Sequence, residues 1–225
     1  MKTSSLTREI FIWLIILIPF AYLGLSWNQL PDRIPVHFNL QGEANGWGSK
    51  FSLIGILFAM TVLMNLLLLF IPKLDPKGKI ENMGGKYDQM RLLMVLFMAA
   101  LATFIVYNAL IVYNAPSQHS FNPNLLLILV GGLFVVLGNY FPALKPNYFI
   151  GIRTPWTLES ETVWRKTHRM GGRLWLIGGI IIITAALLPY NNLRTITLVS
   201  TIITITLIPT IYSFLELRKE QRVNA

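Results

Sequence analysis

The chain has no cysteine among its 225 residues. It therefore has no disulfide framework, no thiol nucleophile and no cysteine-based metal site, and its composition leaves the redox compartment open. Charged residues are also scarce, at 13% of the chain, whereas 54% of the residues are hydrophobic and the mean hydropathy is +0.56. These proportions exclude an ordinary soluble domain and predict an integral membrane protein in contact with the lipid bilayer.

Acidic residues are few as well, with 10 Asp and Glu against 19 Lys and Arg, which gives a formal net charge of +9. Such an excess of positive charge is also found in nucleic-acid-binding proteins. In this chain, however, the basic residues occur in short segments between apolar runs, and a role in membrane topology explains them better. Since no soluble domain carries a basic patch, we expect no direct contact with nucleic acid.

Long apolar runs dominate the rest of the sequence. A membrane-spanning helix needs about 20 mostly apolar residues. Six runs approach or exceed this length and predict six transmembrane helices, the first of them retained rather than cleaved as a signal peptide. The fold class is therefore all-α, a polytopic membrane protein with both termini on the same side. The predicted spans are residues 10–27, 51–71, 92–113, 125–141, 174–189 and 195–215.

The distribution of Lys and Arg predicts the orientation of these spans. Sixteen of the 19 basic residues lie in the N-terminal segment, the second and fourth loops and the C-terminal tail, which six spans place on one side. Because Lys and Arg near span ends resist translocation, both termini are predicted to be cytoplasmic. The loop of residues 28–50 is then extracellular, and the loop of residues 142–173 is cytoplasmic.

The interiors of the predicted spans carry no Asp, Glu, Lys, Arg or His. This absence weighs against a pump or an ion-coupled transporter, because such proteins usually need intramembrane ionisable groups. Small and polar residues in the spans are interpreted as packing devices: glycines that allow close helix approach, a threonine series, and asparagines that bond between helices. They are Gly131, Gly132, Gly178, Gly179, Thr197, Thr201, Thr204, Asn65, Asn108 and Asn139.

The extracellular loop contains too many helix breakers to be a helix, and it is interpreted as a specified turn structure. His37, with Asp32 and Glu43, suggests either a metal or acid–base site or, more simply, a hydrogen-bonded structural histidine. The apolar residues Ile34, Val36, Phe38 and Trp47 are expected to fold onto the outer ends of the spans. The residues singled out as the motif of this loop are Pro31, Pro35, His37, Phe38, Asn39, Gly42 and Trp47.

In the cytoplasmic loop, Thr154 and Pro155 are predicted to begin a short helix, because Thr is a good N-cap and Pro suits the first helical position. Arg165, His168 and Arg169 would share one helix face, and Gly171-Gly172 would end the helix before the fifth span. Two interpretations stay open: an interfacial helix that binds anionic headgroups, or a docking site for a cytoplasmic partner. The candidate partner-binding residues are Gly151, Arg153, Thr154, Pro155, Trp156, Thr157, Trp164 and Arg169.

The run Phe149-Ile-Gly-Ile-Arg-Thr-Pro-Trp-Thr-Leu158, with Glu161-Thr-Val-Trp164 and Arg169 after it, closely resembles the signature of the SdpI family. The outer run of Leu30-Pro31, Ile34-Pro35, His37-Phe38 and Gly42 resembles the DUF1648 membrane domain of unknown function. The resemblance implies two membrane regions. Residues 1–115 would be DUF1648-like and hold spans one to three, and residues 116–225 would hold spans four to six with the SdpI signature.

Members of the SdpI family are bacterial membrane proteins. The best-known member gives immunity to a secreted sporulation-delaying toxin and holds a transcriptional repressor at the membrane. The resemblance therefore implies a plasma-membrane immunity or signalling protein with a secreted peptide toxin and a cytoplasmic repressor as partners. No cofactor, metal or enzymatic activity is expected, because an enzyme needs a nucleophile, a base and an orienting group on one side, whereas His37 and His119 are predicted outside and His168 inside. The alternative is a small-molecule or lipid transporter built from two three-helix halves.

Overall fold

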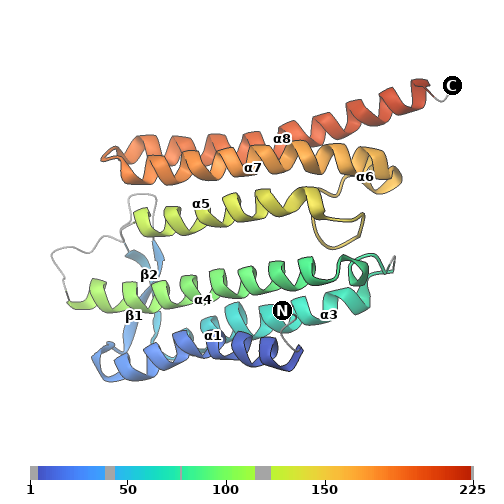
Figure 1. Ribbon diagram of the computed structural model, residues 1–225. Helices are drawn as coiled ribbons and strands as arrows, with labels where there is room; N and C mark the ends of the chain where they lie inside the picture. The colour runs from blue at the N-terminus through green and yellow to red at the C-terminus, as the bar shows by residue number, and fades with distance from the viewer. Residues whose placement is uncertain (1–4, 39–43, 77, 115–122, 224–225) are drawn as a thin grey trace. The chain divides into compact units, whose positions relative to one another are not determined.

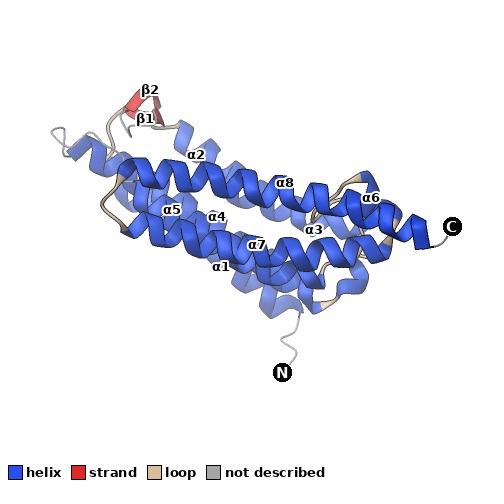
Figure 2. Cartoon of the chain, turned by 90° about the horizontal axis from the view of Figure 1, so that it is seen from above, coloured by secondary structure: helices blue, strands red, loops and turns tan. Residues whose placement is uncertain are grey.

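The computed structural model describes residues 5–38, 44–76, 78–114 and 123–223 (Figure 1). Almost all of the regular structure is helical, and one β-hairpin lies near α2 (Figure 2). A π-helical stretch, Phe58–Leu63, joins α2 and α3 into one continuous helix. The long and short α-helices are α1 (Ser5–Ser26), α2 (Ser52–Leu57), α3 (Met64–Leu74), α4 (Gly85–Asn114), α5 (Pro123–Tyr140), α6 (Pro155–Glu159), α7 (Glu161–Leu187) and α8 (Asn191–Val223).

In the described part of the chain, six helical segments are long and apolar enough to cross a membrane, which confirms the predicted all-α polytopic fold. Most of them extend beyond the predicted spans. The largest difference is at the fifth span, where α7 begins at Glu161 and runs without a break through Gly171 and Gly172. The prediction that these glycines end a helix is therefore wrong. Both are buried, and their missing side chains make room for neighbouring segments.

The loop of residues 28–50, predicted to be extracellular, contains two strands that the sequence analysis did not predict. Strand β1 (Arg33–Phe38) pairs antiparallel with β2 (Ala44–Ser49), with irregular register around His37. The glycines that argued against regular structure are needed in β2 because the strands approach closely. A Cβ at Gly46 would lie 2.8 Å from the His37 Cβ, and one at Gly48 would lie 3.0 Å from the Val36 Cγ1.

The chain forms two compact units. The first comprises residues 1–69 and 91–126, and the second comprises residues 70–90 and 127–225. One core cluster of the first unit joins Ile34 of the hairpin to Leu53, Leu57 and Val106. In the second unit, Trp164 of α7 packs with buried residues that precede or begin α4 and with residues that follow α5. These residues are Ile80, Met83, Tyr87, Met90, Phe141 and Leu144.

The helices of the first unit extend past the predicted spans and include ionisable groups that lie just outside them. Arg91 belongs to α4 and its side chain is only 3% exposed. Its guanidinium donates two hydrogen bonds to the Glu9 carboxylate of α1, at 2.7 and 2.8 Å. Two further bonds from Arg91, at 3.0 and 2.9 Å, reach the Asn65 Oδ1 of α3. The interhelical bond predicted for Asn65 is therefore confirmed, with a charged partner on the other helix.

The other two asparagines make no such bond. Asn108 donates from Nδ2 to the Phe104 carbonyl of its own helix, at 2.9 Å, and Asn139 is exposed. Thr201 behaves as a packing residue. It is buried on α8, and a Cβ added at Gly178 of α7 would lie only 2.6 Å from the Thr201 Cγ2. Figure 1 shows α7 and α8 running side by side.

Glycines bring α5 and α7 into backbone contact at two levels of the second unit. A Cβ at Gly138 would lie 2.6 Å from the Gly172 carbonyl oxygen, and one at Gly131 would lie 2.8 Å from the Gly179 carbonyl oxygen. Each helix thus presents two glycines spaced seven residues apart, the spacing that places them on one face. The predicted role in close helix approach is confirmed for Gly131 and Gly179, whereas Gly132 has no neighbouring atom within 4 Å.

This difference between neighbouring glycines predicts a matched result. Gly138→Val is expected to lower the free energy of unfolding by about 3 kcal/mol, because the added atoms overlap the backbone of α7. Gly132→Val adds the same atoms in open space on the same helix, so its effect should stay within about 0.5 kcal/mol. Unfolding of the detergent-solubilised variants in sodium dodecyl sulfate, followed by tryptophan fluorescence, measures both. Equal losses would contradict the contact between α5 and α7.

Candidate partner-binding segment

The signature segment, residues 145–169, begins with a loop organised by a buried asparagine. Asn147 is completely buried, and all its amide hydrogen-bonding positions are used. Its Oδ1 accepts from the backbone N–H groups of Phe149 and Ile150, at 2.8 and 2.7 Å. Its Nδ2 donates to the carbonyls of Lys145 and Ile150, at 2.8 and 3.1 Å. One side chain therefore fixes the entry into the loop.

Two threonines then start α6 as the sequence analysis predicted. Thr154 is the N-cap and Pro155 the first helical residue. The Thr154 Oγ1 accepts from the Thr157 N–H at 3.2 Å, and the Thr157 Oγ1 accepts from the Thr154 N–H at 2.9 Å. This reciprocal capping satisfies backbone donors that a helix start leaves free. Both threonines are buried, and the Thr154 hydroxyl also bonds to the Ser213 hydroxyl of α8 at 3.1 Å.

His168 holds the loop against α7. Its Nε2 accepts from the Ile152 N–H at 2.9 Å, which requires an unprotonated nitrogen, so Nδ1 carries the hydrogen and donates to the Trp164 carbonyl at 2.9 Å. The imidazole stacks on the Trp164 indole, with ring centroids 4.0 Å apart. Trp164 is itself completely buried, and its Nε1 donates to the Leu144 carbonyl at 2.7 Å.

Gly151 makes this arrangement possible. Its φ of +111° lies in a region that L-residues with a side chain rarely adopt. A Cβ at this position would also overlap the Nε2 of His168, which is bonded to the next residue along the chain. The signature glycine is therefore needed twice, for its backbone conformation and for the space that it leaves to the histidine.

The predicted binding residues separate into two groups by burial. Thr154, Thr157 and Trp164 are buried, and with Gly151 they support the loop rather than face outward. Arg153, Pro155 and Arg169 are exposed. Trp156 is half-buried and packs against the Phe214 ring of α8, with centroids 5.1 Å apart. The Arg153 guanidinium donates to the Tyr148 carbonyl, which orients it beside the loop.

An exposed basic face accompanies this loop. Arg165, Arg169 and Arg173 occupy positions i, i+4 and i+8 of α7, and all three are exposed. His168, predicted to share the face of Arg165 and Arg169, is buried against the loop instead. Lys166 turns toward α8 and donates to Glu216 at 2.7 Å, and Lys219 donates to the other oxygen of the same carboxylate at 3.0 Å.

Sequence reasoning missed Asn147, the support role of His168, and Ser213 and Phe214 of α8. An asparagine directly before an aromatic pair in a loop is a signal for a turn organised by its side chain, since Asn readily bonds the backbone two residues on. The contacts to α8 join positions more than 50 residues apart. The spacing of residues along the chain does not predict such a contact.

The motif residues of the loop predicted to be extracellular lie around the hairpin of the first unit. Ile34 is buried, as expected of a residue folded onto the spans, and Pro35 is buried as well. Val36 and Trp47, for which the same was expected, are instead 46% and 47% exposed. His37 is exposed and bonds through Nδ1 to the Asn45 Oδ1 at 2.5 Å, which is a structural role. Pro31 and Phe38 are half-buried. Asn39, Gly42 and Glu43 lie outside the described residues.

Both nitrogens of His168 are engaged in backbone bonds, and the described residues contain no group of three His, Cys, Asp or Glu side chains that could hold a metal ion. What the segment presents is a set of arginines on a loop and helix whose backbone is fixed by buried hydrogen bonds.

Comparison with known proteins agrees with this description. Residues 143–213 match the model of the SdpI/YfhL protein family, and residues 14–64 match DUF1648, a domain of unknown function. The molecule is a multi-pass membrane protein with a segment similar to the SdpI/YfhL family in its second half and one similar to DUF1648 in its first, which are the two resemblances named in the sequence analysis.

One curated relative shows how far the similarity extends. The chain is 25% identical over 177 residues to the Immunity protein SdpI of Bacillus subtilis (strain 168), which covers 78% of this chain and 79% of the relative. The similarity thus exceeds the signature segment and includes most of both proteins. No solved structure matches the fold.

Proposed function

We propose that this protein is a non-enzymatic immunity protein of the bacterial plasma membrane, which protects the membrane from a secreted antimicrobial peptide. The observation that carries the proposal is the similarity to Immunity protein SdpI along 78% of the chain. The six apolar helices support a location in the bilayer. In the predicted orientation the hairpin is available to a secreted peptide, and the signature segment is available to a cytoplasmic protein.

The exposed part of the signature segment supports a second step, recruitment of a transcriptional repressor. Arg153 and Arg169 are exposed, and Arg153 lies on the loop fixed by Asn147. A preorganised basic surface binds a partner at a lower entropic cost than a flexible one. The partner expected from this charge is an acidic surface of the repressor.

The transporter alternative has less support. The buried charge of Arg91 is the feature that most resembles a transport site. Its guanidinium, however, already donates four of its five N–H groups to the Glu9 carboxylate and to Asn65, so at most one remains for a substrate.

Survival of a sensitive strain tests the proposal. Cells that express the protein are exposed to a panel of secreted membrane-active peptides, including the sporulation-delaying toxin against which the family's best-known member protects. Protection against a member of the panel is expected, and protection against none would overturn the proposal.

A variant pair separates the recruitment step from protection. Arg153→Ala/Arg169→Ala is expected to weaken membrane localisation of a fluorescent fusion of the family's repressor at least about tenfold, since two exposed charges are lost from the docking surface. Arg222→Ala, an exposed arginine at the end of α8, is the control and should leave it unchanged. Equal localisation in both variants would refute the assignment of Arg153 and Arg169.

A further inference from the structure

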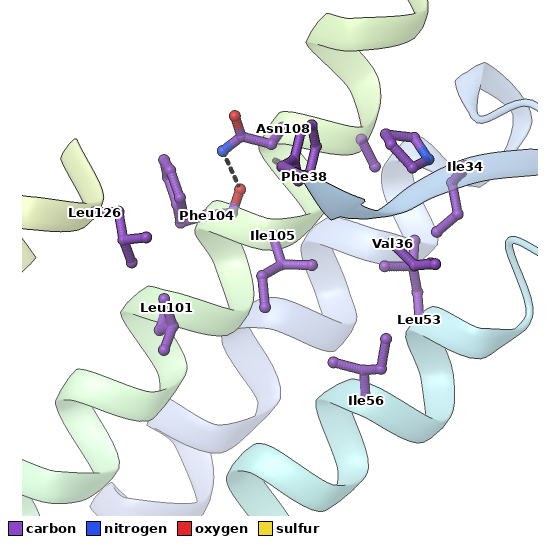
Figure 3. Close-up of a pocket in the computed structure, with 12 residues that line it drawn as sticks. Ile34, Val36, Phe38, Leu53, Ile56, Leu101, Phe104, Ile105, Asn108 and Leu126 are labelled. Carbon is purple, nitrogen blue, oxygen red and sulfur yellow. Dashed lines mark hydrogen bonds between the residues drawn. The ribbon is translucent and has the colours of Figure 1, made fainter. Parts of the chain in front are cut away.

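The first unit contains an apolar pocket of about 350 Å³ beneath the β-hairpin (Figure 3). Strand β1 provides one wall, α2 a second and α4 a third. The volume lies within the range of roughly 300–1,000 Å³ typical of ligand pockets. The residues that line the pocket are Ile34, Pro35, Val36, Phe38, Leu53, Ile56, Leu101, Phe104, Ile105, Asn108, Ala109 and Leu126.

Asn108 is the one polar side chain among these lining residues. It is 8% exposed, and its Nδ2 donates to the Phe104 carbonyl at 2.9 Å. Figure 3 shows the amide nitrogen turned toward that carbonyl and the amide oxygen turned away from it. Among the described residues no donor bonds to this oxygen. The Asn108 oxygen is therefore an acceptor that a ligand with an N–H group can use.

We propose that this pocket binds an apolar segment of the secreted peptide from which the protein protects the membrane; this inference rests on the proposed function. The hairpin is the predicted extracellular element, so the pocket beneath it is accessible from the side on which a secreted peptide arrives. Apolar side chains of the peptide fill the space between β1, α2 and α4. A backbone N–H of the same segment donates to the Asn108 Oδ1.

Two observations favour a peptide over a lipid acyl chain as the occupant. An acyl chain fits the apolar walls equally well, but it carries no donor for the Asn108 oxygen. The sheet that forms one wall has only two strands in the described part of the chain, so β1 has an edge that no other described strand pairs. Such an edge offers backbone groups to an extended peptide and nothing to a hydrocarbon.

A matched pair of isoleucines on α2 tests the pocket. Ile56 lines it, whereas Ile54, two residues earlier, is exposed and does not. Fluorescently labelled sporulation-delaying toxin is titrated against the full chain in lipid nanodiscs. Ile56→Trp fills the pocket and is expected to raise the dissociation constant at least about tenfold, since a filled pocket excludes the peptide side chains. Ile54→Trp adds the same ring outside and should leave the constant within about twofold.

The Asn108→Leu variant tests the polar contact. It keeps the size of the side chain and removes the acceptor, and it is expected to weaken binding about fivefold, the usual value of one buried hydrogen bond. If both Ile56→Trp and Asn108→Leu bind the peptide with wild-type affinity, the proposal that the pocket binds it is overturned. The proposed function would still stand if the wild-type protein protects the cells. Native mass spectrometry provides a second readout, because it detects phospholipid that stays bound to the purified protein. If only Ile56→Trp loses this phospholipid while its peptide binding is unchanged, the pocket is an acyl-chain site and the proposal is overturned.

The same titration keeps the two hypotheses apart. A wild-type protein that does not bind the toxin overturns the pocket as a toxin site. The proposed function is also overturned only if the survival assay shows no protection against any peptide of the panel. Binding and protection that are both lost in Ile56→Trp, but not in Ile54→Trp, would support both.

Discussion

Replacing Glu9 with alanine is expected to destabilise the protein by about 3–5 kcal/mol, the cost of leaving a buried charge without its partner. The charge at risk is Arg91, whose side chain is 3% exposed and receives its only anionic partner in the described part of the chain from α1. Asn65 alone cannot neutralise a guanidinium, since its amide oxygen carries no net charge.

The opposite replacement should be milder. Arg91→Met removes the buried charge and leaves Glu9, whose side chain is 30% exposed and can be solvated. The expected loss is about 1–2 kcal/mol, and the double variant Glu9→Ala/Arg91→Met should be close to Arg91→Met alone, because the unpaired charge has gone. Denaturation in sodium dodecyl sulfate measures all four proteins. Additive losses in the double variant would show that Glu9 and Arg91 do not interact.

Gly151→Ala is expected to lower the free energy of unfolding by about 3 kcal/mol or more. An alanine would have to adopt a φ of +111° and would overlap the imidazole of His168. The backbone conformation alone costs on the order of 1–2 kcal/mol, and the overlap adds a comparable amount because His168 is bonded on both sides and cannot withdraw. Thermal unfolding in detergent reports the loss.

Gly84→Ala is the control for this prediction. Gly84 has a φ of +55° and no atom within 4 Å of the added Cβ, so the variant bears conformational strain without overlap. A loss of about 1–2 kcal/mol is expected there. If Gly84→Ala and Gly151→Ala lost equal stability, the packing of the signature loop against His168 would not be the reason for the glycine.

The six spans were predictable because length and hydropathy decide whether a segment can cross a membrane, and neither depends on tertiary contacts. The start of α6 was predictable for a similar reason, since Thr154 caps a helix through neighbours three residues away. The sequence could not reveal that Arg91 lies inside the first unit. Its charge suggested a loop, and only the distant partners Glu9 and Asn65 allow it to be buried.

The hairpin and the supporting role of His168 escaped prediction for the same physical cause. Glycines in β2 are unfavourable locally and are required only because His37 and Val36 of β1 lie opposite them. The bonds of His168 to Ile152 and of Thr154 to Ser213 join separate elements of the second unit. Local propensity carries no information about either contact, so the burial of much of the signature became apparent only in three dimensions.

The lengths of the last two helices have a consequence for the membrane itself. With 27 and 33 residues, α7 and α8 are about 40 and 50 Å long, whereas a hydrocarbon core is roughly 30 Å thick. Lys166 and Glu216 fasten them together near the ends that carry the signature segment. In a thin bilayer the ends of α7 and α8 that carry the signature segment extend beyond the lipid, whereas in a thick bilayer the arginines of α7 lie closer to the phosphates. Bilayer thickness thus sets the height at which the loop is presented.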